Sequence, residues 1–398
     1  MYLQSKGFNF LMVSLNLIFK IEKVIAKVLY ACGLDGHLSN RYVDNLIQST
    51  EKLKDGFNLN PIEAEFCARI LGYETISNAE KIDFLSALAN KGETALEVSA
   101  FAKVFRSLAI NPQLDDYAAC GIDVCGTGGD GFGTFNISTT VAFVLAALGI
   151  PVLKHGNRSI TSKCGSADLM EAIGIELMID LHNHRKALEA LNFTFFFAPS
   201  FHPVFKSIMP ARKALAANGS KSIFNLLGPL INPAKPKFQL IGVYSKEWIN
   251  PIAEALDNMN LDRGIVVHGV PLEGTALDEL SCAGHNFHRG FGKLSGIDGV
   301  LEIQSTGLQR CDAEELKGGT VEDNTKILFA FASNEESTVP RGLRDTIYLN
   351  TAAALLSCGR VQTLSEGVLQ ARSCIESGKL INWINKVRDF YKSIARQS

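Results

Sequence analysis

The sequence has little of what marks a membrane, disulfide-linked or nucleic-acid-binding protein. No stretch reaches the roughly 18 apolar residues that a membrane-spanning helix requires, so no membrane partner is expected. The nine cysteines include no CxxC pair, which argues against a disulfide framework or zinc cage and favours reduced thiols in the cytoplasm. The net charge is only -2, whereas nucleic-acid-binding domains usually carry a basic surplus. Any anion-binding site must therefore be local.

The N-terminal segment has one feature of a secretory signal, because Lys6 precedes the apolar-leaning stretch 8–19. Polar residues interrupt that stretch, and charged residues follow it without a small-residue cleavage site. The favoured interpretation is an amphipathic helix or an extension. We therefore assign residues 1–40 to an N-terminal extension.

The chain of 398 residues is longer than most single domains, which favours two domains with a cleft between them. Residues 41–115 show the three and four spacing of amphipathic helices and predict a small helical domain. The helical pattern of about 200–222 is expected to join it. Residues 116–398 predict a larger α/β domain.

The predicted α/β domain alternates short apolar strands with polar loops and helices. This pattern indicates a mainly parallel central sheet covered by helices, with ligands at the carboxyl ends of its strands. The clearest predicted strands are 121–125, 150–153, 193–197, 238–244 and 264–268.

A glycine-rich loop between a strand and a helix is the sharpest chemical signal. Five glycines occur among residues 126–133, so the backbone can approach a ligand closely and direct N–H groups at it. Ser138 or a neighbour is expected to cap the following helix, whose N-terminus suits a phosphate. The alternative is a flexible turn that binds no ligand and is followed by an ordinary helix cap.

A second polar loop follows the next predicted strand. Lys154 and Arg158 supply two cations, and Ser159, Thr161 and Ser162 supply hydroxyl donors. On its own this segment could be a solvated loop. Two such loops on successive strands indicate one shared polyphosphate site.

The glycine-rich loop also satisfies the dinucleotide pattern GxGxxG. A nicotinamide site expects an acidic residue about 20 positions further on, but Lys154 and His155 stand there. An NADP-dependent reductase remains an alternative from this loop alone. A P-loop is not supported, because the GK[ST] sequence is absent.

Four ordered motifs resemble those of anthranilate phosphoribosyltransferases: GTGGDGFGTFNIST, KHGNRSITSKCGSAD, FNLLGPLINPA and LDE. The resemblance runs from about residue 50 to the C-terminal region. It implies a helical domain beside an α/β domain like that of the pyrimidine nucleoside phosphorylases, and a homodimer through the helical domain. It also implies phosphoribosyl transfer from phosphoribosyl pyrophosphate (PRPP) to anthranilate with Mg²⁺, two ions per active site being expected.

Carried over residue by residue, the resemblance implies a set of substrate and metal contacts. Gly126, Asn157 and Arg212 match positions that contact anthranilate, and Ser138, Asp278 and Glu279 match magnesium ligands. The matched PRPP contacts are Gly126, Gly129, Asp130, Thr134, Asn136, Ile137, Ser138, Thr139, Lys154, His155, Gly156, Asn157, Arg158, Ser159, Ile160, Thr161, Ser162 and Ser166.

Several of these assignments depend on the resemblance. Without it, Arg212 reads as a surface arginine and the adjacent Asp278 and Glu279 as an exposed acidic pair. A guanidinium fork suits a carboxylate, and carboxylates with substrate phosphates suit Mg²⁺. His182 and His184, on a polar stretch, are expected to face solvent.

The sequence departs from the family pattern in three places. Residues 268–275 form a longer loop before the acidic pair, and residues 282–290 carry His285 and His288 in place of a threonine-containing run. His285 and His288 have no third ligand in the sequence near them, so a transition-metal site is not favoured there. The third departure is a small insertion at residues 217–221.

Rival functions remain at this stage. A pyrimidine nucleoside phosphorylase is disfavoured because KHGNR stands where its lysine-serine-arginine pattern is expected. A nonenzymatic nucleic-acid-binding relative is disfavoured because the substrate motifs are intact and the charge is slightly acidic.

Overall fold

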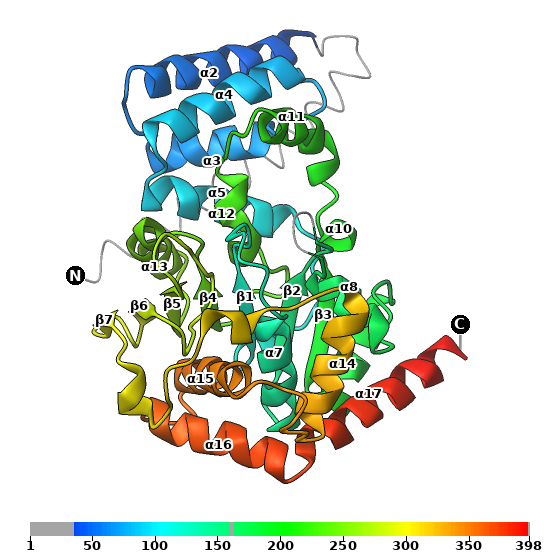
Figure 1. The fold of residues 1–398 in the computed structure, drawn as a ribbon. Coiled ribbons are helices and arrows are strands. Elements are labelled where there is room, and N and C mark those ends of the chain that lie inside the picture. The colour runs from blue at the N-terminus through cyan, green and yellow to red at the C-terminus, as the bar shows by residue number, and fades with distance from the viewer. Residues whose placement is uncertain (1–35, 160–162, 397–398) are drawn as a thin grey trace, which may run out of the picture.

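The computed structural model describes residues 36–159 and 163–396. A seven-stranded sheet has the order β3-β2-β1-β4-β5-β6-β7 (Figure 1). Strands β1 to β5 are parallel, whereas β6 and β7 continue the sheet antiparallel at one edge. The strands are β1 Ile122–Gly126, β2 Val152–Gly156, β3 Phe193–Phe197, β4 Phe238–Gly242, β5 Arg263–Val270, β6 His285–Gly292 and β7 Asp298–Val300.

Helices α2 to α5, with α11, lie together at one end of the molecule (Figure 1). The starts of α3, α4 and α5 are encoded locally, because each begins with a capping box in which side chain and backbone satisfy each other's hydrogen bonds. These helices are α2 Gly36–Lys54, α3 Pro61–Ile70, α4 Asn78–Lys91, α5 Ala95–Leu108 and α11 Phe205–Ala217.

Helix α11, distant in sequence, packs on α4. The buried Lys81 ammonium donates to the Ser207 carbonyl at 2.8 Å, and Phe105 of α5 stacks on Phe205 of α11 with ring centroids 5.2 Å apart. One hydrophobic cluster joins these helices to one face of the sheet through α13, Ile249–Asn258. The helical part thus forms a wall beside the strand ends.

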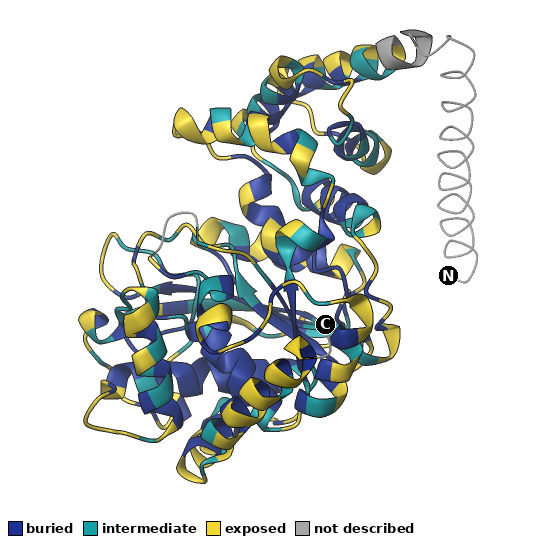
Figure 2. Cartoon of the chain, turned by 90° about the vertical axis from the view of Figure 1, so that its right-hand side faces the viewer, coloured by how far each residue is buried: buried dark blue, intermediate teal, exposed yellow. Residues whose placement is uncertain are grey.

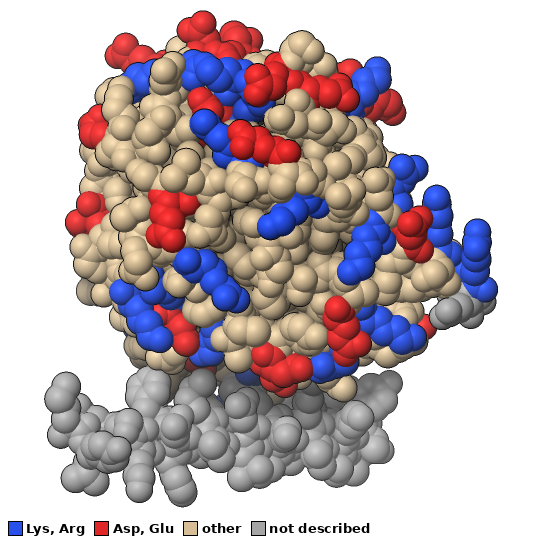
Figure 3. Space-filling view, turned by 90° about the horizontal axis from the view of Figure 1, so that it is seen from below, with Lys and Arg blue, Asp and Glu red and all other residues tan. Residues whose placement is uncertain are grey.

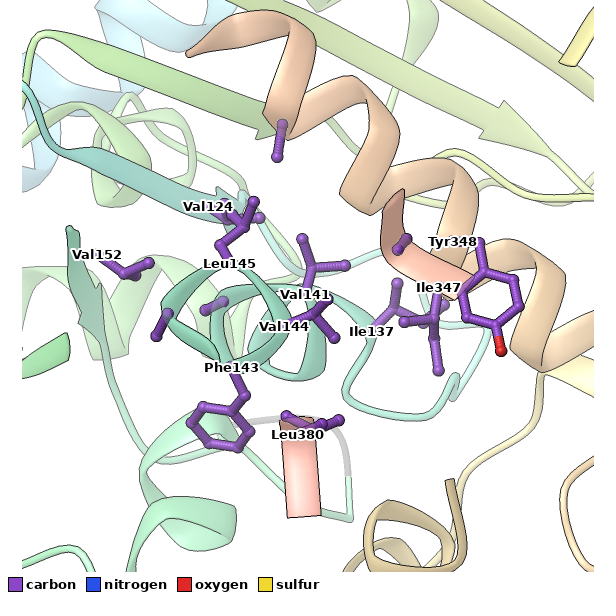
Figure 4. Close-up of a cluster of buried hydrophobic side chains, with 14 of the residues drawn as sticks. Val124, Ile137, Val141, Phe143, Val144, Leu145, Val152, Ile347, Tyr348 and Leu380 are labelled. Atoms are coloured by element: carbon purple, nitrogen blue, oxygen red, sulfur yellow. The ribbon is translucent and has the colours of Figure 1, made fainter. Parts of the chain in front are cut away.

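The opposite face of the sheet packs on a larger apolar core. Helix α7, Ile137–Ala147, is apolar around its circumference because it is enclosed by strands and other helices. Figure 4 shows Val141 and Val144 of α7 pointing into this cluster, with Val124 and Ile347 nearby. The core fixes the position of the α7 N-terminus relative to β1.

The remaining helices complete the α/β part. Helix α15 is almost entirely buried, whereas α17 shows an exposed and a buried side, as the burial colouring in Figure 2 illustrates for the outer helices. They are α6 Asp115–Ala118, α8 Ser166–Ala172, α9 Leu181–Leu191, α10 Ala198–Phe201, α12 Phe224–Leu227, α14 Val321–Ala332, α15 Arg341–Ser357, α16 Leu364–Glu376 and α17 Lys379–Ala395.

The predicted α/β class with a mainly parallel sheet is confirmed. All five predicted strands overlap β1 to β5, but β6 and β7 were not predicted. The expectation for His184 is wrong: its ring is buried against Phe196 and Phe201, and Nδ1 lies 2.8 Å from the Thr194 hydroxyl. The possible signal segment lies outside the described residues.

The described surface agrees with the balanced composition. Acidic and basic side chains are interspersed on the face seen in Figure 3. No helix in the described ranges is long and apolar enough to cross a membrane.

Candidate active site

A cavity of about 890 Å³ opens at the carboxyl ends of β1 and β2, facing α11 and α12. It is lined by the glycine-rich loop, the second polar loop, the acidic pair and aromatic residues of the helical wall. Every predicted site residue that the structure describes borders it: Gly126, Gly129, Asp130, Thr134, Asn136, Ile137, Ser138, Thr139, Lys154, His155, Gly156, Asn157, Arg158, Ser159, Ser166, Arg212, Asp278 and Glu279. Ile160, Thr161 and Ser162 lie outside the described residues.

The glycine-rich loop has a backbone that other residues rarely adopt. Gly128, Gly129, Gly131 and Gly133 have φ angles between 67° and 77°. A Cβ on Gly126 would lie 2.1 Å from Asp278 Oδ2, so this glycine allows the acidic pair to approach β1. The loop therefore brings backbone N–H groups and carboxylates to one wall of the cavity.

The acidic pair binds two backbone donors of that wall. Asp278 Oδ2 accepts from the Gly128 N–H at 2.7 Å, and Glu279 Oε1 accepts from the Ser138 N–H at 3.0 Å. The expected side-chain cap is wrong in detail: Asn136 is the N-cap residue and its side chain makes no capping bond. Glu279 supplies the acceptor instead, and its charge suits the helix N-terminus.

The surroundings of Asp278 and Glu279 disfavour negative charge on both carboxyl groups, so a cation bound beside them would stabilise their charged forms. Burial, with Asp130 nearby, raises the pKa of Asp278 to about 7. Burial and Asp278 also raise the pKa of Glu279. A divalent cation would relieve this repulsion, so the oxygen ligands fit Mg²⁺.

The protein alone does not complete a metal shell here. Within residues 36–159 and 163–396, no group of three or more His, Cys, Asp or Glu side chains is arranged around one ion position. Mg²⁺ commonly takes one or two carboxylates and completes its octahedron with water and substrate phosphates. The pair fits that mode of binding.

The two cations of the second loop differ in their surroundings. Lys154 is buried, and its Nζ donates to the Val124 carbonyl at 2.6 Å, beneath the glycine-rich loop. Arg158 is half-exposed and forms ion pairs with Asp168 and Glu171. Arg158 is therefore held by two carboxylates of the following helix, whereas Lys154 lies buried at the base of the cavity.

The loop is fixed by further hydrogen bonds. The Ser166 hydroxyl donates to the Asn157 carbonyl at 3.1 Å, and Asp168 accepts from the Gly165 and Ser159 N–H groups. Burial, with His202 nearby, lowers the pKa of His155 to about 3. His155 is thus a neutral ring at pH 7 and not a third cation.

Arg212 extends from α11 into the opposite wall. Its guanidinium lies 5.7 Å from the Phe205 ring centroid and 5.1 Å from that of Phe224. No carboxylate in the described part of the chain forms an ion pair with it, and burial lowers its pKa. A guanidinium between two aromatic rings suits a planar aromatic carboxylate.

The sequence did not single out the aromatic and basic residues that complete the wall. Phe224 lies within a recognised motif, but nothing local shows that its ring meets Arg212. Lys221 was treated only as part of an insertion, yet its Nζ lies 3.7 Å from the Tyr244 ring centroid at the edge of the cavity. His285 and His288 lie on β6 and do not border the cavity.

Two polar, glycine-containing loops at the carboxyl ends of parallel strands, with an acidic pair and an arginine facing them across one cavity, are typical of enzymes that transfer a phosphorylated sugar. Consistently, the family model described as "Glycosyl transferase family, a/b domain" matches residues 119–381.

Individual relatives narrow this class. The chain is 37% identical over 350 residues to the anthranilate phosphoribosyltransferase of Petrotoga mobilis, covering 87% of this chain and 97% of the relative. It is 40% identical over 332 residues to that of Prochlorococcus marinus strain MIT 9313, covering 83% and 91%. The chain belongs to the anthranilate phosphoribosyltransferase family.

Solved structures of anthranilate phosphoribosyltransferases have a similar fold. The crystal structure of anthranilate phosphoribosyltransferase from Thermus thermophilus is 36% identical with a TM-score of 0.77, covering 86% of this chain and 99% of that one. The Saccharomyces cerevisiae enzyme in complex with PRPP and Mg is 25% identical with a TM-score of 0.75, covering 87% and 98%.

Proposed function

We propose that this chain transfers the phosphoribosyl group of PRPP to the amine of anthranilate, giving N-(5-phosphoribosyl)anthranilate and pyrophosphate. This reaction is the second step of tryptophan biosynthesis from chorismate. One observation carries the proposal: the glycine-rich loop, the second polar loop and the acidic pair line the same cavity as Arg212. Arg212 lies between two aromatic rings and has no ion-pair partner within the described ranges. The solved yeast complex with PRPP and Mg supports the same donor and metal.

The reaction is a displacement at the anomeric carbon of the ribose. The bond to the pyrophosphate oxygen breaks, the anthranilate nitrogen forms the new bond, and the nitrogen then loses a proton to water or phosphate. No general base is needed for attack, because an uncharged aromatic amine already has a lone pair. The protein's main task is to orient the two substrates and stabilise the leaving group.

The residues have complementary roles in this scheme. Asp278, Glu279 and the Ser138 hydroxyl would hold Mg²⁺, with two ions per site, to neutralise charge on pyrophosphate. The two loops bind PRPP through backbone N–H groups, hydroxyls and Lys154. Arg212 binds the anthranilate carboxylate, with Asn157 and Gly126 beside it.

The assembly and domain division belong to the same proposal. Residues 41–115 with about 200–222 form the helical domain and residues 116–398 the α/β domain, consistent with the packing of α11 on α4. The chain forms a homodimer through the helical domain, where Ile47, Ile62 and Leu96 are exposed. Its place of action is the cytoplasm.

The test is product identification. Purified protein incubated with anthranilate, PRPP and Mg²⁺ should give one product whose mass equals anthranilate plus the phosphoribosyl group, with one pyrophosphate per product. A product only when inorganic phosphate and a nucleoside are supplied would instead favour a nucleoside phosphorylase.

A further inference from the structure

A buried carboxylate lies directly behind the cavity. Asp123 is the second residue of β1, three residues before the glycine-rich loop, and is fully buried. Burying a carboxylate is costly unless it is paired and hydrogen-bonded. Asp123 does not border the cavity, and substrate binding as described above does not use it.

Asp123 accepts hydrogen bonds from three side-chain or backbone donors at the base of the site. Oδ1 accepts from the His155 N–H at 3.3 Å, and Oδ2 accepts from Asn232 Nδ2 at 2.8 Å and from Cys125 Sγ at 3.7 Å. Asn232 Nδ2 also donates to the Leu153 carbonyl at 2.7 Å. The carboxylate therefore holds the residues on both sides of Lys154.

Lys154 completes this network from the other direction. Its Nζ crosses from β2 to the Val124 carbonyl, adjacent to Asp123 in β1. Burial lowers the pKa of Lys154, and the charge of Asp123 opposes that effect more than Cys125 or Glu279 does. Arg106 of α5 is the second cation that Asp123 supports.

We propose that Asp123 is a positioning residue for PRPP: its buried carboxylate is the counter-ion that holds Lys154 across the base of the glycine-rich loop. This inference rests on the proposed function. Asp123 touches neither substrate and acts through Lys154. A preformed cation needs no rearrangement when the phosphates arrive, which favours their binding.

The test measures PRPP binding calorimetrically with Mg²⁺ and, separately, the KM for anthranilate. Asp123→Asn keeps the size and removes the charge, so the Kd for PRPP should rise about 10-fold or more. The KM for anthranilate should change by less than about 3-fold. Equal losses for both substrates would indicate a merely structural role and overturn the proposal.

Backgrounds that lack one of the two nearby cations test which of them Asp123 positions. In a Lys154→Gln background, Asp123→Asn should weaken PRPP binding no further. In a matched Arg106→Gln background it should still do so, and the reverse pattern would assign Asp123 to Arg106.

If Asp123→Asn does not fold, the melting temperature of a double variant tests the pairing of Asp123 with Lys154. Lys154→Met removes the nearer-strand cation of the two that Asp123 supports, so adding Asp123→Asn to that variant should raise its melting temperature. A further fall would overturn the pairing. If the unmodified chain itself fails to bind PRPP, the proposed function fails; if it binds and Asp123→Asn binds equally, only the positioning role fails.

Discussion

Replacing Asp278 and Glu279 with Asn and Gln tests the metal site by removing two charges while keeping the shape. Each amide retains an oxygen that can accept from the Gly128 or Ser138 N–H. The loss therefore falls on metal binding and on the leaving group. The rate should drop by about 100-fold to 1000-fold, the usual effect of removing catalytically placed electrostatic groups.

The same substitution has the opposite effect on the metal-free fold. The pKa of Asp278 rises from 3.8 to about 7 on folding, a difference equivalent to at most about 4 kcal/mol. Because the folded pKa is the higher one, this contribution to stability is complete below about pH 4 and is lost as the pH rises through about 7. The double variant should therefore unfold at a higher temperature than the unmodified chain at pH 8 without Mg²⁺.

The assay follows the initial rate against Mg²⁺ concentration, with thermal melts at pH 5 and pH 8. Excess Mg²⁺ should recover part of the rate, and Mg²⁺ should raise the melting temperature of the unmodified chain more than that of the variant. Glu273→Gln is the matched control, because this carboxylate is exposed on the same loop. A double variant with a normal rate and an unchanged Mg²⁺ dependence would refute the site.

Three further changes separate the substrate sites. Arg212→Ala should raise the KM for anthranilate by about 10-fold or more and leave PRPP affinity nearly unchanged, because it removes a charged partner of the carboxylate; equal losses toward both substrates in steady-state kinetics would contradict this role. Lys154→Ala should act mainly on PRPP, measured as its Kd, and Arg158→Ala should have the smaller effect because Arg158 is already ion-paired; a larger loss from Arg158→Ala would reverse that ranking. A chain beginning near Asn40 should fold and keep most of its activity, since every matched motif lies after that residue; a soluble, folded but inactive product would give the extension a role.

Local signals predicted the parallel part of the sheet well. Each of its five strands is an apolar run followed by a polar or glycine-rich loop, which is the pattern that burial between helices requires. Strand β6 has no such run, because His285, His288 and Arg289 interrupt its apolar residues, although it pairs with β5 on one side and β7 on the other. Strand β7 is short and exposed.

The motifs predicted which residues meet at the site, but not their local partners. Arg158 pairs with Glu171 of the following helix, and Glu279 accepts from the Ser138 N–H across 141 residues of sequence. His184 is buried because the rings of Phe196 and Phe201 pack against it. Such contacts depend on tertiary packing, so the linear pattern of polar residues does not predict them.

Loss of anthranilate fluorescence on adding PRPP tests the central claim most directly. With Mg²⁺ present, the purified chain should consume anthranilate at a rate proportional to protein concentration, and omitting PRPP or chelating Mg²⁺ should stop the loss. Constant fluorescence under all three conditions, from protein shown by calorimetry to be folded, would contradict the account.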